Sequence, residues 1–188
     1  VLWDMKSFYQ MLRHDLILTR ARSTGFPDCL ARLAVNLYRA PRHISFMRNL
    51  ASPISPNRGV APGCSLAQTI VKVYCLQPFD DFVTRHPHAP LDVFIDDIQM
   101  AAEGVQEQVC SRVVSAAKDM REVVRTEIRA ELATSKAAVV ASNEIVAKKV
   151  RKQLGEDGGR AVTMATALGI DFGAGRRITT TAQSAKQR

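Results

Sequence analysis

The chain has few aromatic residues. They make up 6% of its 188 residues and include a single tryptophan, so the composition does not indicate a surface that stacks many bases. It also lacks any run of 18 or more apolar residues, and no transmembrane helix is expected. Trp3, Asp4 and Lys6 interrupt what would be the apolar part of a signal peptide. These absences predict an intracellular protein, nuclear or cytoplasmic, that is not secreted and has no membrane partner.

Cysteine is scarce and follows no pattern. The four cysteines form no Cys-x-x-Cys spacing and have no paired histidines, so a zinc site is not expected. Isolated cysteines in a domain of this size predict reduced, mostly buried thiols. They are Cys29, Cys64, Cys75 and Cys110.

Acidic residues are outnumbered by basic ones. Lys and Arg total 26 against 18 Asp and Glu, which gives a net charge of +8 and a pI near 9.7. Such a surplus favours a polyanionic partner through counterion release and electrostatic steering. On charge alone, a nucleic acid and a merely solvated basic surface are equally good interpretations.

The apolar fraction of 46% is enough to form the core of one domain. Few strands, long helices and short connections predict an α+β fold, with a small antiparallel sheet and helices packed on one face. In the helix over residues 29–39, Leu30, Leu33, Ala34 and Leu37 form the apolar stripe expected to face the core. Helices are expected over residues 11–22, 29–39, 64–83, 105–132 and 143–154, and strands over residues 1–5, 43–50, 91–102 and 137–141, with a last strand ending at Phe172.

Asp96 and Asp97 form an acidic pair inside an apolar segment. Burial and mutual repulsion raise the pKa of such carboxylates, and in a straight strand neighbouring side chains would point to opposite faces. Both difficulties ease if the pair lies at a hairpin turn and a divalent cation neutralises it. A solvated Asp-Asp turn is the alternative, and on the pair alone it is favoured. The other acidic pair, Asp80-Asp81, continues a helical pattern and is interpreted as a solvated helix face.

Asp4 is a single acid at the centre of another apolar strand. If this strand pairs beside the hairpin over residues 91–102, three carboxylates meet at one point. Oxygen-rich clusters of this kind suit magnesium. Two such ions stabilise the attacking and leaving oxygens of a phosphoryl displacement. The spacing of the acids does not show that they meet.

Five segments, in this order, resemble the motifs of reverse transcriptases and together span almost the whole chain. The order is more specific than any one motif, and the style is nearest to the enzymes of non-LTR retroelements and group II introns. The first motif has an acid followed by an aromatic pair, the second is a glycine-rich turn that opens a helix, and the third is the aromatic-x-Asp-Asp signature. The fourth is a lysine before a strand, and the fifth is the hairpin that grips the primer. The segments are residues 4–9, 58–67, 94–97, 135–141 and 168–172.

The resemblance implies a polymerase palm that transfers a nucleotide from a dNTP to the 3′-OH of a DNA primer on an RNA template. Asp4, Asp96 and Asp97 would hold two Mg²⁺ ions, with Mn²⁺ as an alternative and the backbone carbonyl of Met5 as a further ligand. Lys136 would stand near the pyrophosphate leaving group. The resemblance further assigns Phe8, Tyr9 and Gly63 to the nucleotide and Leu168 and Gly169 to the primer grip. A ring at position 9 would exclude a 2′-hydroxyl, which favours DNA synthesis.

Two features depart from the family pattern. Pro62 stands where the second motif has a glutamine, and Pro62 has no side-chain donor. The chain begins three residues before Asp4, so we expect a palm over residues 1–178 with fingers and thumb largely missing and a basic tail over residues 179–188. The alternatives are the palm of an RNA-dependent RNA polymerase, which shares the three acids, and a catalytically dead remnant that only binds nucleic acid.

Overall fold

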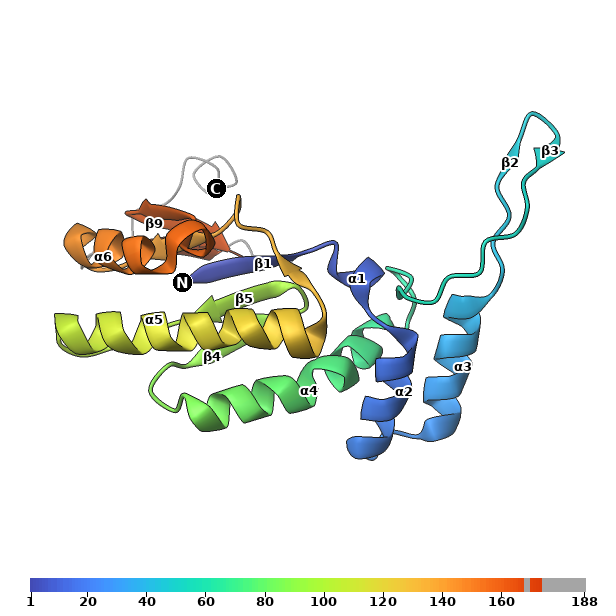
Figure 1. The fold of residues 1–188 in the computed structure, drawn as a ribbon, viewed down its shortest axis with the longest axis horizontal. Coiled ribbons are helices and arrows are strands. Elements are labelled where there is room, and N and C mark those ends of the chain that lie inside the picture. Colours follow the sequence, from blue (N-terminus) through green and yellow to red (C-terminus); the bar gives the residue numbers. More distant parts are fainter. Residues whose placement is uncertain (168–169, 174–188) are drawn as a thin grey trace. The chain divides into compact units, whose positions relative to one another are not determined.

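The computed structural model describes residues 1–167 and 170–173, which form two compact units (Figure 1). The sheet unit comprises Val1–Lys6, Asp81–Glu127 and the described residues from Glu131 onward. The helical unit comprises Ser7–Asp80 and Ile128–Ala130. None of the helices in the described ranges is long and apolar enough to cross a lipid bilayer.

The sheet unit is organised around β1 (Leu2–Lys6), which has strands on both sides. The sheet order is β4-β5-β1-β7-β8, and the short β6 also pairs with β1. All neighbouring pairs are antiparallel except β7 and β8, which are parallel. The other strands are β4 (Leu91–Phe94), β5 (Asp97–Met100), β6 (Glu131–Leu132), β7 (Ala138–Val140) and β8 (Arg160–Val162).

The predicted α+β composition is confirmed, but the sheet is mixed and not wholly antiparallel. The helix α6 (Glu144–Leu154) connects β7 to β8 and returns the chain to the end of the sheet where β7 began. A strand that enters the sheet after such a crossover runs parallel to its neighbour. Gly159 precedes β8 with a φ of 53°, and a Cβ there would lie 2.1 Å from the carbonyl oxygen of Ala137. The close approach of β8 to β7 therefore requires glycine.

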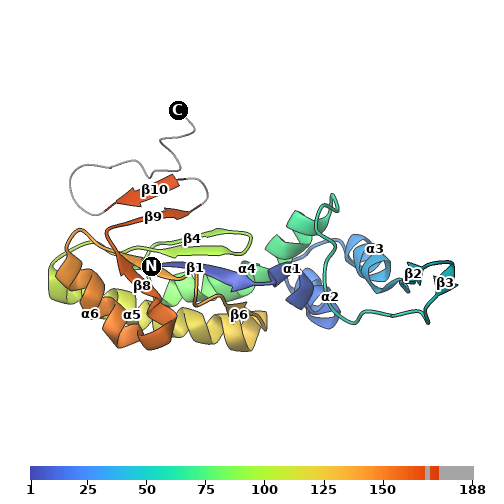
Figure 2. The same ribbon diagram turned by 90° about the horizontal axis from the view of Figure 1, so that it is seen from above.

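The two faces of the sheet have different surroundings. Along β1, Trp3 and Met5 are buried at 3% and 0% exposure, whereas Leu2 and Asp4 on the other face are half-buried. Figure 2 shows α5 (Gln106–Glu122) and α6 on one side of the sheet and the hairpin of β9 (Met164–Ala167) and β10 (Ile170–Gly173) on the other. The Trp3 indole also donates a hydrogen bond to the carbonyl of Asp157 (2.7 Å). Asp4 therefore stands on the face away from the helical core.

The helix expected over residues 105–132 is shorter and less regular than its apolar pattern suggested. α5 ends at Glu122 and passes into a π-helical turn, η1 (Val123–Ile128). Arg129 has a left-handed φ of 60°, which a continuing helix cannot accommodate. The chain then forms β6 against β1, so apolar residues after position 128 serve a strand. The 3₁₀ turn η2 (Gly155–Gly158) follows α6.

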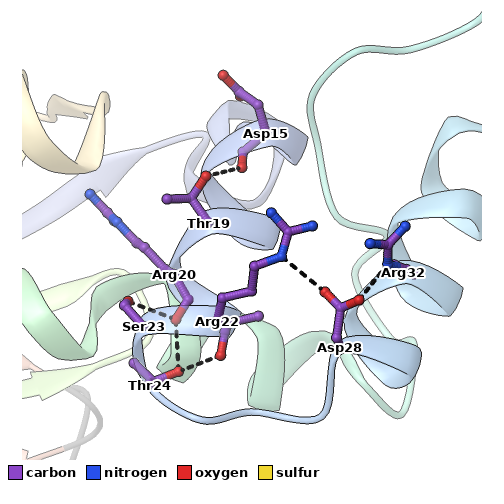
Figure 3. A network of polar contacts seen from close by, with 9 residues as sticks. Asp15, Thr19, Arg20, Arg22, Ser23, Thr24, Asp28 and Arg32 are labelled. Atoms are coloured by element: carbon purple, nitrogen blue, oxygen red, sulfur yellow. Dashed lines mark hydrogen bonds and ion pairs between the residues drawn. The ribbon is translucent and has the colours of Figure 1, made fainter.

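The helical unit contains α1 (Phe8–Met11), α2 (His14–Ser23), α3 (Asp28–Arg39) and the part of α4 (Ala67–Arg85) up to Asp80. Its small core includes Ala21, Ala31 and Val73. Figure 3 shows how charge joins α2 to α3, because the Asp28 carboxylate accepts bonds from Arg22 (3.2 Å) and Arg32 (2.5 Å). The bond from Arg32 is the main reason why the pKa of Asp28 lies below its usual range.

The apolar stripe expected on α3 faces the core only in part. Its leucines are exposed, at 40% for Leu30, 53% for Leu33 and 58% for Leu37. The buried face is made of smaller residues and one tyrosine, which let α3 pack closely: Ala31, Ala34, Val35 and Tyr38. The helix has two apolar sides, and from the periodicity alone we predicted the side with the leucines to be the buried one, which is wrong for the three leucines.

The four cysteines are free thiols. Cys75 and Cys110 are buried, Cys64 is half-buried and Cys29 is exposed, so the expectation of mostly buried thiols holds for two of them. Burial raises the pKa of Cys75 to about 12, which keeps this thiol protonated and unreactive.

The start of the crossover helix α6 offers a test of the fold. The Asn143 side chain caps it by accepting a hydrogen bond from the Ile145 N–H (2.8 Å). Asn143→Ala should lower the free energy of unfolding by about 1 kcal/mol, because that N–H loses its partner. Asn143→Asp should preserve stability, because a carboxylate accepts the same bond and suits a helix N-terminus. Urea unfolding followed by circular dichroism measures both, and equal stability of the alanine variant would contradict the capping role.

Candidate active site

Strands β1 and β5 bring two of the expected carboxylates together. In their antiparallel register Asp4 lies directly opposite Asp97. Side chains in such positions share one face of the sheet, with Cβ atoms about 5 Å apart. Next to this pair the Met5 N–H donates to the carbonyl of Asp96 (2.8 Å). The chain segments that carry all three acids therefore meet at one end of the β1–β5 pair.

The tight turn between β4 and β5 sets the position of the acidic doublet. Ile95 and Asp96 are the only residues between the paired Phe94 and Asp97. Ile95 has a φ of 60°, a left-handed conformation that costs a β-branched residue about 1–2 kcal/mol. Two-residue hairpins need a positive φ at the first turn position, which is why glycine or asparagine is usual there. Asp96 thus lies in a strained turn and Asp97 begins β5, so the two adjacent side chains need not alternate as they do in a straight strand.

Charge at this corner of the sheet is only partly balanced. Burial raises the pKa of Asp97, and the negative charges of Asp96 and Asp4 raise it further, while Lys136 opposes them. The Lys136 ammonium lies 2.5 Å from a carboxylate oxygen of Asp4, and this hydrogen bond raises the pKa of Lys136. The Lys136 side chain is 68% exposed, so solvent screens the pair and its contribution to stability is small.

A cleft of about 570 Å³ opens over these residues on the face of the sheet that carries Asp4. Its wall includes the acids Asp4, Asp92 and Asp97, and the cations Lys136 and Arg160. Arg160, which comes from β8, was not predicted as a site residue from the sequence. A single arginine in a three-residue strand gives no signal of a site, and only the register of β7 and β8 brings it to this face.

The wall also has aromatic and backbone elements. Phe94 is 56% exposed beside Asp97, an unusual degree of exposure for a phenylalanine in a sheet. Met164, Ala165 and Thr166 of β9 complete the opposite side. The cleft therefore combines carboxylates, cations and the exposed ring of Phe94, which suits a ligand with both charged and planar parts.

The donor set fits a divalent cation, although no three His, Cys, Asp or Glu side chains gather into a ready-made metal site within residues 1–167 and 170–173. Asp4 and Asp97 face each other, and a cation between them would relieve the repulsion that raises the pKa of Asp97. Asp96, which precedes Asp97 in the sequence, is the third carboxylate near this point. Met5 is fully buried and does not line the cleft.

The residues that sequence analysis assigned to the nucleotide belong to the helical unit. The Val60 N–H donates to the carbonyl of Tyr9 (2.8 Å), so the segments resembling the first and second motifs meet there. The Phe8 side chain is 2% exposed and packs in the core, whereas Tyr9 remains half-buried. Gly63 is exposed with a φ of 84°, in the left-handed region that favours glycine. Leu168 and Gly169, expected in the primer grip, lie outside the described residues.

His14 fixes the same loop and was not identified from the sequence. Its ring is fully buried, with Nε2 2.8 Å from the carbonyl of Gly59 and Nδ1 3.4 Å from Nε of Arg39. Because Arg39 can only donate, Nδ1 accepts and the proton lies on Nε2, so the ring is neutral. Burial is the main cause that lowers the pKa of His14. A histidine within a polar helix start gives no sequence signal of such a role.

No model of a known protein family matches this chain, and no characterised protein sequence matches it. The chemical interpretation therefore depends on the geometry of the cleft and on the order of the motifs.

The repulsion at Asp97 predicts a charge-dependent stability. In the presence of EDTA, Asp97→Asn should raise the free energy of unfolding at pH 7, because asparagine keeps the shape of the side chain without its charge. The pKa of Asp97 is raised in the folded protein, so wild type should recover stability as the pH falls through that pKa and the gap should close. Asp92→Asn, on exposed β4, is the matched control and should not change stability. A less stable Asp97→Asn variant would contradict this electrostatic account.

The buried ring of His14 predicts a second pH dependence. Its folded pKa lies below the ordinary value of about 6.5, so the folded protein binds fewer protons than the unfolded chain between the two values. The free energy of unfolding should therefore fall as the pH drops below about 6.5. His14→Gln keeps an N–H for the Gly59 carbonyl but does not titrate, and urea unfolding across this range should show a weaker pH dependence. His88→Gln, at an exposed loop position, should retain the wild-type profile.

Proposed function

We propose that this chain is the catalytic palm of a reverse transcriptase, an RNA-directed DNA polymerase of the non-LTR retroelement or group II intron type. The observation that carries the proposal is the register that sets Asp4 opposite Asp97, beside the strained Ile95-Asp96 turn. Two acids from distant parts of the sequence share an open face above a cleft, as a nucleotidyl transfer site requires.

In this proposal Asp4, Asp96 and Asp97 hold two Mg²⁺ ions, or Mn²⁺ in their place, with the Met5 carbonyl as a further ligand. The ions supply charge stabilisation to the attacking and leaving oxygens of the transfer. Lys136 already donates to Asp4 and is largely exposed, so it is free to turn toward a leaving pyrophosphate once Asp4 is otherwise neutralised. There it would donate a hydrogen bond or a proton.

The substrates of this proposal are a dNTP, a DNA primer and an RNA template, used inside the nucleus or cytoplasm. The preference for deoxynucleotides follows from Tyr9, whose half-buried ring would exclude a 2′-hydroxyl. Polymerases that make RNA usually have a second acid at this position, whereas this chain has the bulky, uncharged Tyr9. The proposal therefore ranks DNA synthesis above RNA synthesis.

One contact favours a second candidate, a remnant that binds nucleic acid without catalysis. The Lys136 ammonium neutralises Asp4 within the protein, so the acids do not all depend on a metal for compensation. Calorimetric titration with MgCl₂ separates the two candidates. A live site should bind Mg²⁺ with an affinity that falls when Asp4 is replaced by asparagine, whereas a remnant should bind nucleic acid and show no specific magnesium response.

Primer extension tests the proposed reaction directly. On a primed RNA template with Mg²⁺ and dNTPs, Asp97→Asn should reduce incorporation by at least about 100-fold, because a carboxylate that holds the ions is lost. Asp92→Asn lines the same cleft without belonging to the three acids and should stay within a few-fold of wild type. Equal incorporation by wild type and Asp97→Asn would reject the metal-binding role.

A variant of Tyr9 tests the preference for deoxynucleotides in the same primer-extension assay. Tyr9→Val should raise the incorporation of ribonucleotides relative to deoxynucleotides, because the smaller side chain leaves space for a 2′-hydroxyl. Gel analysis with matched dNTP and rNTP pools measures the ratio. A wild-type preference for ribonucleotides would instead favour an RNA-dependent RNA polymerase.

A further inference from the structure

The positive charge of the protein is concentrated in one unit. Within Ser7–Asp80 and Ile128–Ala130 there are ten Lys and Arg against three Asp, which gives the helical unit +7 of the total +8. Between Asp28 and Asp80 the sequence contains no acid at all. A surface of this kind attracts a polyanion and releases its counterions on binding.

A two-stranded ribbon, residues 42–54, extends from this basic stretch just after α3 (Figure 1). Its base is closed by two hydrogen bonds, from Arg42 N–H to Ile54 C=O and from Ile54 N–H to Arg42 C=O, both 2.9 Å. Its end is formed by β2 (Ser45–Phe46) and β3 (Asn49–Leu50), which pair antiparallel. All of its side chains are exposed, so the ribbon contributes little to the core of its unit.

One face of the ribbon combines charge with apolar surface. Along the first strand side chains alternate, so Arg42, Ile44 and Phe46 share a face. Ile44 is 61% exposed and Phe46 is 71% exposed. Isolated two-stranded ribbons are at best marginally stable in water. Exposed apolar side chains add no stability to such a ribbon, and their exposure is typical of a binding surface.

The tip of the ribbon is strained. Met47 and Arg48 have φ values of 46° and 66°, and they are the two central residues of the turn. Such turns normally use asparagine and glycine, which tolerate the left-handed conformation. Arg48 is exposed at the end of the ribbon, and no residue within the described ranges forms an ion pair with Arg42 or Arg48.

We propose that the ribbon, residues 42–54, is a binding site for a single-stranded nucleic acid, with Arg42 and Arg48 on phosphates and the Phe46 ring stacked on an unpaired base. The charge favours a nucleic acid as the partner. The stretch between Asp28 and Asp80 contains basic residues and no acid, so it attracts a polyanion more strongly than it attracts a protein surface of mixed charge. A β-ribbon that presents basic residues and an exposed ring matches how proteins contact nucleic acid strands. The inference does not depend on the proposed polymerase reaction.

Fluorescence anisotropy with a labelled 20-nucleotide single-stranded RNA tests it, in EDTA and over a series of KCl concentrations. The double variant Arg42→Gln/Arg48→Gln should reduce the slope of log affinity against log salt by about 1.4, because each lost phosphate contact removes about 0.7. Phe46→Ala should weaken binding on the order of tenfold and leave the slope unchanged, because a base loses its stacking partner without a change of charge.

Matched controls come from the sheet unit. Lys118→Gln/Lys149→Gln removes two exposed charges and should retain nearly the wild-type slope, and Ile145→Ala removes an exposed apolar side chain of similar accessibility. The assay contains EDTA and no nucleotide substrate, so its outcome does not depend on the proposed catalysis. Circular dichroism of each variant should be unchanged, since the ribbon packs against no core.

Single-stranded DNA and a duplex, used as probes in place of the RNA, test which kind of strand the ribbon binds. DNA of the same sequence shows whether the strand is read through the 2′-hydroxyl, and a blunt duplex should bind more weakly because it offers no unpaired base. The proposal is overturned if the ribbon variants keep wild-type affinity and slope, or if the duplex is preferred. It is also overturned if Phe46→Ala abolishes self-association measured by light scattering while RNA binding is unchanged.

Discussion

Pairing of β1 with β5 decides both what enters the core and which charges face each other. The register that buries Trp3 and Met5 beneath the helices places Asp4 on the opposite face, directly across from Asp97. A slip of one residue would carry the acids into the core and the apolar side chains to the surface, so hydrophobic burial holds the register. The apolar face thus provides the free energy that keeps two like charges together, and the cleft, the acidic doublet and the lysine contact all depend on it.

Such an arrangement stores unfavourable energy at the place where chemistry is proposed. The turn holds Ile95 in a left-handed conformation, and the neighbouring charges raise the pKa of Asp97. Strain and repulsion of this kind persist only where the surrounding structure compensates for them. Lys136 offers partial compensation through Asp4, but it is exposed and screened. A divalent cation would be the stronger compensation, which supports the metal-dependent role proposed above.

Local patterns in the sequence predicted what depends on neighbours along the chain. The apolar segment around Asp96 and Asp97 predicted a hairpin with the doublet at its turn, and the helix over residues 143–154 matches α6 closely. What the sequence left undetermined depends on pairing between distant segments. The parallel β8, and with it Arg160 in the cleft, follows from a crossover, and the role of His14 follows from a loop more than 40 residues away. On α3 the pattern showed two apolar sides, and only packing against α2 shows that the alanines face inward.

The uneven distribution of charge between the two units makes the net charge of the chain more informative about a binding partner. A net charge of +8 was equally compatible with nucleic acid and with a solvated surface, but the charge is not spread evenly. The sheet unit, which carries the acidic cleft, is close to neutral, while the helical unit carries nearly all of the surplus. In the proposed function the acids would repel the phosphates of a nucleic acid, and a separate basic surface would offset that repulsion. The ribbon supplies such a surface, and it would serve a polymerase and a non-catalytic nucleic-acid-binding protein equally well.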